Sequence, residues 1–349
     1  MRICSCLLVL AVACHPNSRD AIDVGVIESV PQVVNTPDLQ AACQPTDVVV
    51  TGTRAIRGPW EDDSPSFAQH VGTSIVLETS VSSYVVSLDG DVVDVERPGL
   101  RQLSSDCTAR RYAYDVEVDG DNGTLRFTSD TPTRSVSNRT ANGWMLVVED
   151  VAAAVRLNQN QTATVLAKVS RFGDPVPYAV SSDGRTVLFY DQVYEWLAPS
   201  EADITQTHYR WRRSSRNTQA IGSANAHPTS TTTAGFNGIT YSADGTTIAI
   251  GSNSFTPYSS FGGRTDTVYR GVTRLSLDDV YILALSSDGR WLAFRENGRL
   301  NILDVDSGES FEVPQTDTDF LWDVTFVGAG ETIAGLSTGR LYVVPNPAF

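Results

Sequence analysis

One short unit recurs along most of this chain: an apolar strand, a turn that contains Asp-Gly, and a second apolar strand. Asp-Gly turns supply the positive φ angles that two-residue hairpins need, and the flanking β-branched residues favour strands. The copies are YVVSLDGDVVDV (84–95), YDVEVDGDNGTLRFT (114–128), YAVSSDGRTVLFY (178–190), ITYSADGTTIAIG (239–251), ILALSSDGRWLAF (282–294) and the degenerate VTFVGAGETIAGL (324–336). The pattern predicts an all-β chain of short hairpins.

The spacing of the later copies is typical of a β-propeller. Asp183 and Asp244 are 61 residues apart, and Asp244 and Asp288 are 44 apart. Propeller blades of four strands recur every ~40–50 residues. The longer interval predicts one blade plus an inserted loop at residues 205–235. We expect four-stranded antiparallel sheets and seven blades, with six or eight as alternatives.

The ring should be closed by the two ends of the folded body. A strand that begins near Val48 is predicted to pair with the last strands of the chain, which end in RLYVVPNP. Closure of this kind hides sheet edges that would otherwise aggregate.

Three strings carry a family resemblance: SSDGRTVLF, SADGTTIAI and SSDGRWLAF. They resemble the S-x-D-G-x-x-[LIV]-A-F element of Tol-system and WD-repeat-like propellers. The segment GRLNILDVDSGES (298–310) resembles the companion element, an outer strand that ends in D-x-x-[ST]-G. The resemblance is strong over 178–349 and weaker over 46–177. It implies a fold and says little about function, because propellers serve many functions.

The N-terminus, MRICSCLLVLAVAC, is typical of an export signal, with one Arg before a short apolar run. The residues before Cys14 resemble the bacterial lipobox, although Ala11 stands where Leu is preferred. Cleavage after Ala13 without lipidation is the alternative. His15 follows the cysteine instead of Asp, which by the same resemblance implies the outer membrane. We expect a signal peptide at 1–13, a lipidated Cys14 and tether at 14–45, and the propeller at 46–349.

Two further cysteines remain in the exported chain, Cys43 and Cys107. In an oxidising compartment they are predicted to form a disulfide. Two buried free thiols are the alternative. Neither has a second Cys or a His at ligand spacing, so no metal site is expected there.

The formal net charge of −15 argues against a nucleic-acid partner. One stretch, HYRWRRSSR (208–216), reverses that charge locally. It is a candidate anion or ligand patch, or else a solvated strand whose arginines pair with nearby acids. Alternation along a strand would put Arg210 and Arg212 on one side and Trp211 and Arg213 on the other. The patch residues are Arg210, Trp211, Arg212, Arg213 and Arg216.

No catalytic residues, cofactor or metal can be named from the sequence. The favoured function is a membrane-tethered propeller that binds a protein or glycan of the bacterial cell envelope, by analogy with other propellers. One alternative is an envelope enzyme of lyase or glycoside hydrolase type, with carboxylates at the channel mouth. A structural repeat protein in an envelope complex is another. The oligomeric state stays open.

Overall fold

A computed structural model describes residue 39 and most of residues 50–349 of this chain. The gaps after residue 50 are 64, 72–73, 96, 122, 130–131, 149–152, 158–162, 169–175, 199–200, 213, 216, 227–232, 256–263, 279, 315–320, 322 and 338. The predicted signal peptide, Cys14 and Cys43 therefore lie outside the described residues.

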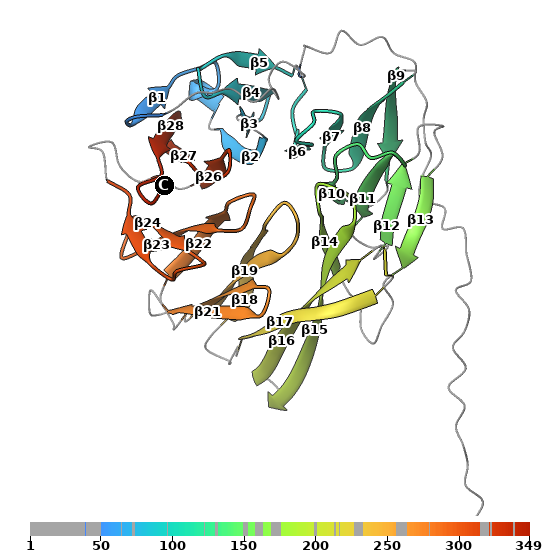
Figure 1. Ribbon diagram of the computed structural model, residues 1–349, viewed down its shortest axis with the longest axis vertical. Coiled ribbons are helices and arrows are strands. Elements are labelled where there is room, and N and C mark those ends of the chain that lie inside the picture. The colour runs from blue at the N-terminus through green and yellow to red at the C-terminus, as the bar shows by residue number, and fades with distance from the viewer. Residues whose placement is uncertain are drawn as a thin grey trace, which may run out of the picture.

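The described strands number 28 and form seven four-stranded antiparallel sheets, arranged around a common axis as a β-propeller (Figure 1). In each sheet the first strand lies nearest the axis, and first strands of neighbouring sheets contact one another. One short 3-10 helix, η1 (Glu61–Asp63), precedes the first complete sheet.

The sheets follow one another in chain order. In the first three, the strands are β2 (Ser66–Val71), β3 (Ser74–Glu78), β4 (Ser83–Ser87) and β5 (Val92–Asp94); β6 (Gln102–Leu103), β7 (Ala109–Arg111), β8 (Asp115–Gly120) and β9 (Gly123–Thr128); and β10 (Thr133–Val136), β11 (Trp144–Val148), β12 (Ala153–Leu157) and β13 (Ala163–Lys168).

The next three sheets have the same order. Their strands are β14 (Val176–Val180), β15 (Thr186–Ala198), β16 (Glu201–Arg212) and β17 (Asn217–Ala226); β18 (Thr233–Tyr241), β19 (Thr247–Phe255), β20 (Arg264–Arg270) and β21 (Thr273–Asp278); and β22 (Val280–Leu285), β23 (Trp291–Glu296), β24 (Arg299–Asp304) and β25 (Ser310–Glu312).

The last sheet joins both ends of the folded body. It consists of β26 (Asp323–Val327), β27 (Thr332–Ser337), β28 (Arg340–Pro345) and β1 (Arg54–Ile56). β1 pairs antiparallel with β28, with Arg54 opposite Val343 and Ile56 opposite Leu341. The predicted ring closure is confirmed, although the closing strand lies at 54–56, a few residues later than expected.

The core is divided among the contacts between neighbouring sheets. Across the ring closure, Ile75 and Leu77 of β3 pack in one cluster with Leu341 and Val343 of β28. All four side chains are fully buried. Each sheet is therefore covered on both faces, which explains the continuous apolar runs of its central strands.

The S-x-D-G motif has a clear structural purpose. In the β14–β15 hairpin, Ser181 Oγ donates to Asp183 Oδ1 (2.6 Å) and accepts from the backbone N–H of Thr186 (2.9 Å). Gly184 follows at a φ of 64°, which costs little only for glycine. The copies at Ser242 and Ser286 make the same two bonds.

A fourth copy of this loop lacks the Asp-Gly pair, because a cysteine replaces the glycine. Ser104 Oγ donates to Asp106 Oδ1 (2.6 Å) and accepts from the Ala109 N–H (2.8 Å). Cys107 then takes the left-handed conformation, at a φ of 54°. The repeat thus extends further towards the N-terminus than the Asp-Gly motif indicates.

The loops are also bonded to one another from sheet to sheet. The backbone N–H of Asn138 donates to Ser182 O (2.8 Å), that of Ser182 to Ala243 O (2.9 Å), and that of Ala243 to Ser287 O (2.7 Å). Ser287 Oγ continues the series to Gly328 O (3.2 Å). This series of bonds ties successive sheets together near the axis.

The inserted loop predicted at 205–235 is wrong. Residues 205–212 belong to β16, 217–226 form β17, and 233–235 begin β18. The long interval between repeats is instead filled by elongated strands, which extend beyond the ring in Figure 1. β15 and β16 pair from Thr186–Arg212 to Ala198–Glu201, and this pairing overrides the loop-like Ser, Thr and Asn composition.

Candidate functional site

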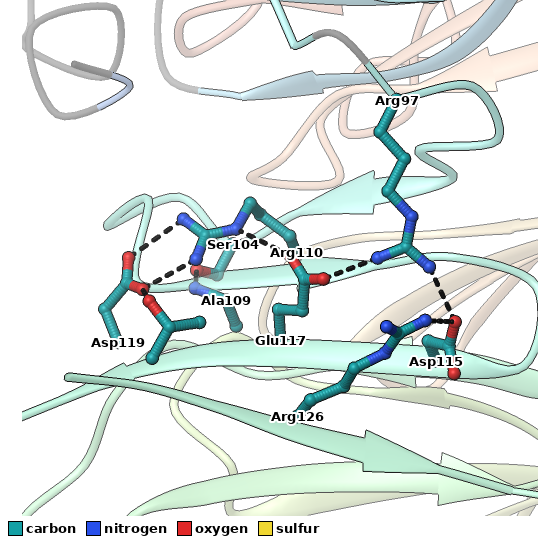
Figure 2. Close-up of polar contacts among 9 residues, drawn as sticks. Arg97, Ser104, Ala109, Arg110, Asp115, Glu117, Asp119 and Arg126 are labelled. Atoms are coloured by element: carbon teal, nitrogen blue, oxygen red, sulfur yellow. Dashed lines mark hydrogen bonds and ion pairs between the residues drawn. The ribbon is translucent and has the colours of Figure 1, made fainter. Parts of the chain in front are cut away.

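A dense polar cluster lies on one face of the β6–β9 sheet (Figure 2). Asp115, Glu117 and Asp119 alternate along β8 and so point to the same side. Arg97 lies between the first two, 2.6 Å from Asp115 Oδ2 and 2.5 Å from Glu117 Oε1. Its guanidinium also stacks on the Tyr112 ring, 3.6 Å from the centroid.

The other two arginines complete this cluster. Arg110, whose side chain is 2% exposed, binds both oxygens of Asp119 at 2.9 and 2.6 Å. Arg126 binds Asp115 at 2.6 Å. The two bonds between Arg110 and Asp119 form a bidentate pair, which is the strongest form of an arginine–carboxylate interaction.

The charges in the cluster stabilise one another. Burial alone would lower the pKa of Arg110, but its hydrogen bond to Asp119 and the charges of Asp119 and Glu117 outweigh burial and raise it. Burial would likewise raise the pKa of Asp115, whereas hydrogen bonds from Arg126, Thr128 and Arg97 lower it. The lowered pKa makes Asp115 a poor general acid. The ion pairs of Glu117 and Asp119 with Arg97 and Arg110 favour a structural role for the cluster.

The arginine patch predicted at 208–216 is not a single surface. Trp211 is buried against Met145, Val147 and Phe189. Arg210 lies on the opposite face of β16, as strand alternation predicts, but it is 7% exposed. Arg212 is exposed at the end of the strand. Arg213 and Arg216 lie outside the described residues.

Arg210 differs from Arg110 in having no ion pair with any described acidic side chain. Its Nε is buried without a hydrogen-bond partner, as is the Nε of Arg110. Burial lowers its pKa, and the neighbouring Arg212 charge lowers it further. Nearby groups favour the charge of both arginines: they outweigh burial at Arg110, whereas the charges of Asp244 and Tyr178 do not outweigh it at Arg210.

His208, to which the sequence assigned no role, is fully buried beside Arg210 on the same face of β16. Its Nδ1 lies 3.3 Å from the Tyr178 hydroxyl, and its Nε2 lies 3.0 Å from Gln206 Oε1. Burial lowers the pKa of His208 to about 3, so the ring is neutral at pH 7. A hydrogen-bonded, inaccessible imidazole suits packing rather than catalysis.

The charged side chains that gather beside the first strands of the β6–β9 and β10–β13 sheets are mainly basic. Arg111 donates from Nε to Gln102 Oε1 (3.2 Å) and from NH1 to Thr133 O (2.7 Å). Burial lowers its pKa to about 10, and the charges of Arg101 and Arg134 add to that effect. The carboxylate of Glu78 belongs to the same group: its charge opposes the lowering of the Arg111 pKa, and it lies 3.5 Å from Arg101.

Cys107 is buried and disulfide-bonded, and its partner lies outside the described residues. It belongs to the same apolar cluster as Leu39, the one described residue of the N-terminal segment. The pairing with Cys43 stays a prediction.

Within the described part of the chain, no three His, Cys, Asp or Glu side chains gather closely enough to hold a metal ion. In the same part, no helix has the length and apolar character needed to cross a bilayer.

Neither a protein-family model nor a curated protein matches the chain. Solved structures do match. U3-55K is 11% identical, with a TM-score of 0.53 over 85% of this chain and 99% of that one. The WD40 repeats of RRP9 are 11% identical, with a TM-score of 0.52 over 84% and 97%. The tricorn protease is 13% identical, with a TM-score of 0.47 over 85% of this chain but 34% of that one. At such identities the first two matches show the fold alone, a WD-repeat-like β-propeller.

Proposed function

We propose that this chain is a membrane-tethered propeller that binds another protein or a glycan of the bacterial cell envelope. The proposal rests on how the ionisable side chains of the described residues are arranged. The carboxylates of β8 form ion pairs with arginines, and His208 is fully buried. Binding through the outer surface then remains the best use of a WD-repeat-like propeller. The net charge of −15 argues against nucleic acid as the partner.

The tether in this proposal is the N-terminal segment. Cys14 would carry the lipid after removal of residues 1–13, and residues 14–45 would link it to the ring, at the outer membrane. The lipobox-like sequence before Cys14 supports this. The variant Cys14→Ser should yield uncleaved or soluble protein on membrane fractionation. Unchanged, processed protein in the membrane would refute lipidation at this residue.

The proposed disulfide joins Cys43 to Cys107. Leu39 is 3% exposed and shares a cluster with Cys107. Cys43 is four residues further along, and an extended chain covers at most ~3.5 Å per residue. Cys43 is therefore within reach of Cys107. Non-reducing peptide mapping should recover the two cysteines in one linked peptide, and alkylation of either one without reductant would exclude the pairing.

The binding function is tested by crosslinking intact cells, purifying this protein in detergent, and identifying bound proteins and glycans by mass spectrometry. We expect the same envelope component in repeated preparations, and its loss when the Cys14→Ser variant is released from the membrane. If no component is enriched over a control lipoprotein, the binding proposal is wrong.

A further inference from the structure

The outer edge of β17 is unlike the outer edges of the other sheets. Each other outer strand has three to six residues and carries at least one charged side chain: Arg54 in β1, Asp94 in β5, Arg126 in β9, Lys168 in β13, Arg274 and Asp278 in β21, and Glu312 in β25. β17 has ten residues, NTQAIGSANA, with no charge and no proline. Short length, charge and proline are three of the features by which proteins prevent unwanted strand pairing at an edge, and β17 lacks these three. Its pairing with β16 has one irregularity, at Ile221 between Ala220 and Gly222.

Part of this edge is already occupied. The backbone N–H of Ser223 donates to the Tyr269 hydroxyl (3.1 Å), which in turn donates to Ser223 O. Gly222 makes room for the Tyr269 ring, because a Cβ there would lie 2.2 Å from it. No described strand pairs with β17 on its outer side. The open stretch is therefore residues 217–221, about the length of an average strand.

The open stretch begins beside positive charge. Asn217 lies opposite Arg212 in the β16–β17 register, and the Arg212 side chain is exposed. The turn between them contains exposed Ser214 and Ser215. In a chain of net charge −15 this corner is a local basic site next to an uncharged edge.

We propose that residues 217–221 of β17 accept an added β-strand from a partner protein, in which an uncharged segment is flanked by an acidic residue beside Arg212. An added strand gains affinity from main-chain hydrogen bonds and specificity from alternate side chains. An uncharged segment matches the uncharged strand, and the acidic flank matches Arg212. This inference deepens the proposed binding function and rests on it.

A second copy of this chain is a less suitable occupant. Two copies would each bring a net charge of −15 to the contact, and like charges oppose association. Pairing between copies is therefore a contrary outcome of the binding experiment.

The probe is a fluorescein-labelled peptide with an alternating Thr-Val core and Asp at both ends, matched by one with Lys at both ends. Binding to the full-length protein is followed by fluorescence anisotropy, and hydrogen exchange locates the bound peptide. We expect the Asp-ended peptide to bind more tightly and to slow exchange of the amides at 217–221.

Two variants and one control sharpen the test. Arg212→Glu should weaken binding of the Asp-ended peptide about tenfold, because an attraction becomes a repulsion. Ala220→Glu puts a charge on the open edge and should weaken it by at least as much. Ser276→Glu, an exposed position on β21, should leave it unchanged. Thermal melts confirm that each variant is folded.

Three results would overturn the inference: no binding of the Asp-ended peptide, protection at residues other than 217–221, or protection of 217–221 that rises with protein concentration without peptide. The last result would identify a second copy as the occupant. If the envelope crosslinking still recovers a partner while any of these is seen, the binding function stands and the β17 edge is not its site.

Discussion

The β6–β9 and β14–β17 sheets are built from the same repeat, but they differ in the ion pairing of a buried arginine and in the length and charge of the outer strand. In the first, Arg110 is held by Asp119 and Glu117, and Cys107 is disulfide-bonded. In the second, Gly184 takes the place of that cysteine, and Arg210 is buried without an ion pair to any described residue. The first sheet also ends in a short charged strand, β9, and the second in the long uncharged β17. We infer that the β6–β9 sheet stabilises the fold through its disulfide and ion pairs, and that the β14–β17 sheet binds other molecules.

Loss of the disulfide should have the largest effect on this comparison. If Cys107 pairs with Cys43, the closed loop spans about 60 residues, and loop entropy contributes about 4 kcal/mol to the free energy of unfolding. Cys107→Ser should lose most of that in urea denaturation. Cys107→Gly should lose about 1 kcal/mol less, because glycine adopts the φ of 54° without strain. Equal losses for the two variants would show that Cys107 is not strained.

Asp119→Ala should come next. It leaves Arg110 buried with only the longer contact to Glu117 (3.5 Å). Removing one member of a buried pair costs about 3–5 kcal/mol, and the partial exposure of Asp119 reduces this to about 2–3. Asp121→Ala, at a side chain 64% exposed, should cost under about 1 kcal/mol by the same measurement. Similar losses would refute the structural role of the Arg110 pair.

Acid should weaken the β14–β17 sheet before the β6–β9 sheet. His208 has a pKa of about 3 in the fold, against 6.5 unfolded. The unfolded chain therefore binds the extra proton between those values, and stability falls as pH drops below 6.5, by about 2 kcal/mol at pH 5. Asp115, whose pKa is lowered, loses its contribution only when pH falls below its unfolded value, near ~3.9.

The His208→Phe variant tests this order. It should flatten the dependence of unfolding free energy on pH between 6.5 and 5, whereas Asp115→Asn should leave that interval unchanged. A steep dependence that persists in His208→Phe would assign the acid sensitivity to another group.

Arg210→Met should have the smallest effect, and one of opposite sign to loss of the Arg110 pair. Arg210 has no ion pair with a described side chain, and burial lowers its pKa although the charge of Asp244 opposes this. Replacing such a buried charge by an apolar side chain of similar size is expected to be neutral or to stabilise by up to about 1 kcal/mol. Calorimetry of the variant measures it. A loss above about 2 kcal/mol would show that Asp244, or a group outside the described residues, compensates the charge of Arg210.

The same two sheets show what the sequence could and could not predict. Asp-Gly hairpins are local, so turn chemistry and the spacing of the copies predict the β-propeller fold. The apolar strands at the two ends of the folded body predict the closure of its ring. The loop at Ser104–Cys107 was hidden, because its glycine is replaced and its Ser-Asp bonds are not visible in the sequence. The polar composition of β17 predicts a loop, and only its pairing with β16 makes it a strand.

The charged residues were harder to predict. Asp115, Glu117 and Asp119 alternate visibly, but Arg97 and Arg110 reach them from other segments. The cluster at 208–216 suggested a surface patch, and packing against the sheets on either side buries Arg210 and Trp211. Burial in a propeller depends on the adjacent sheets, which local sequence does not encode.

The most direct test of the division between the two kinds of sheet is site-specific photocrosslinking in intact cells. A photoreactive residue is placed at Gln219 of β17 or, as the control, at Ser276 of β21, both of which are exposed. We predict a discrete crosslinked partner from position 219 that is lost in Arg212→Glu, and none from position 276. Equal crosslinking from both positions, or none from 219, would contradict this division of roles between the sheets.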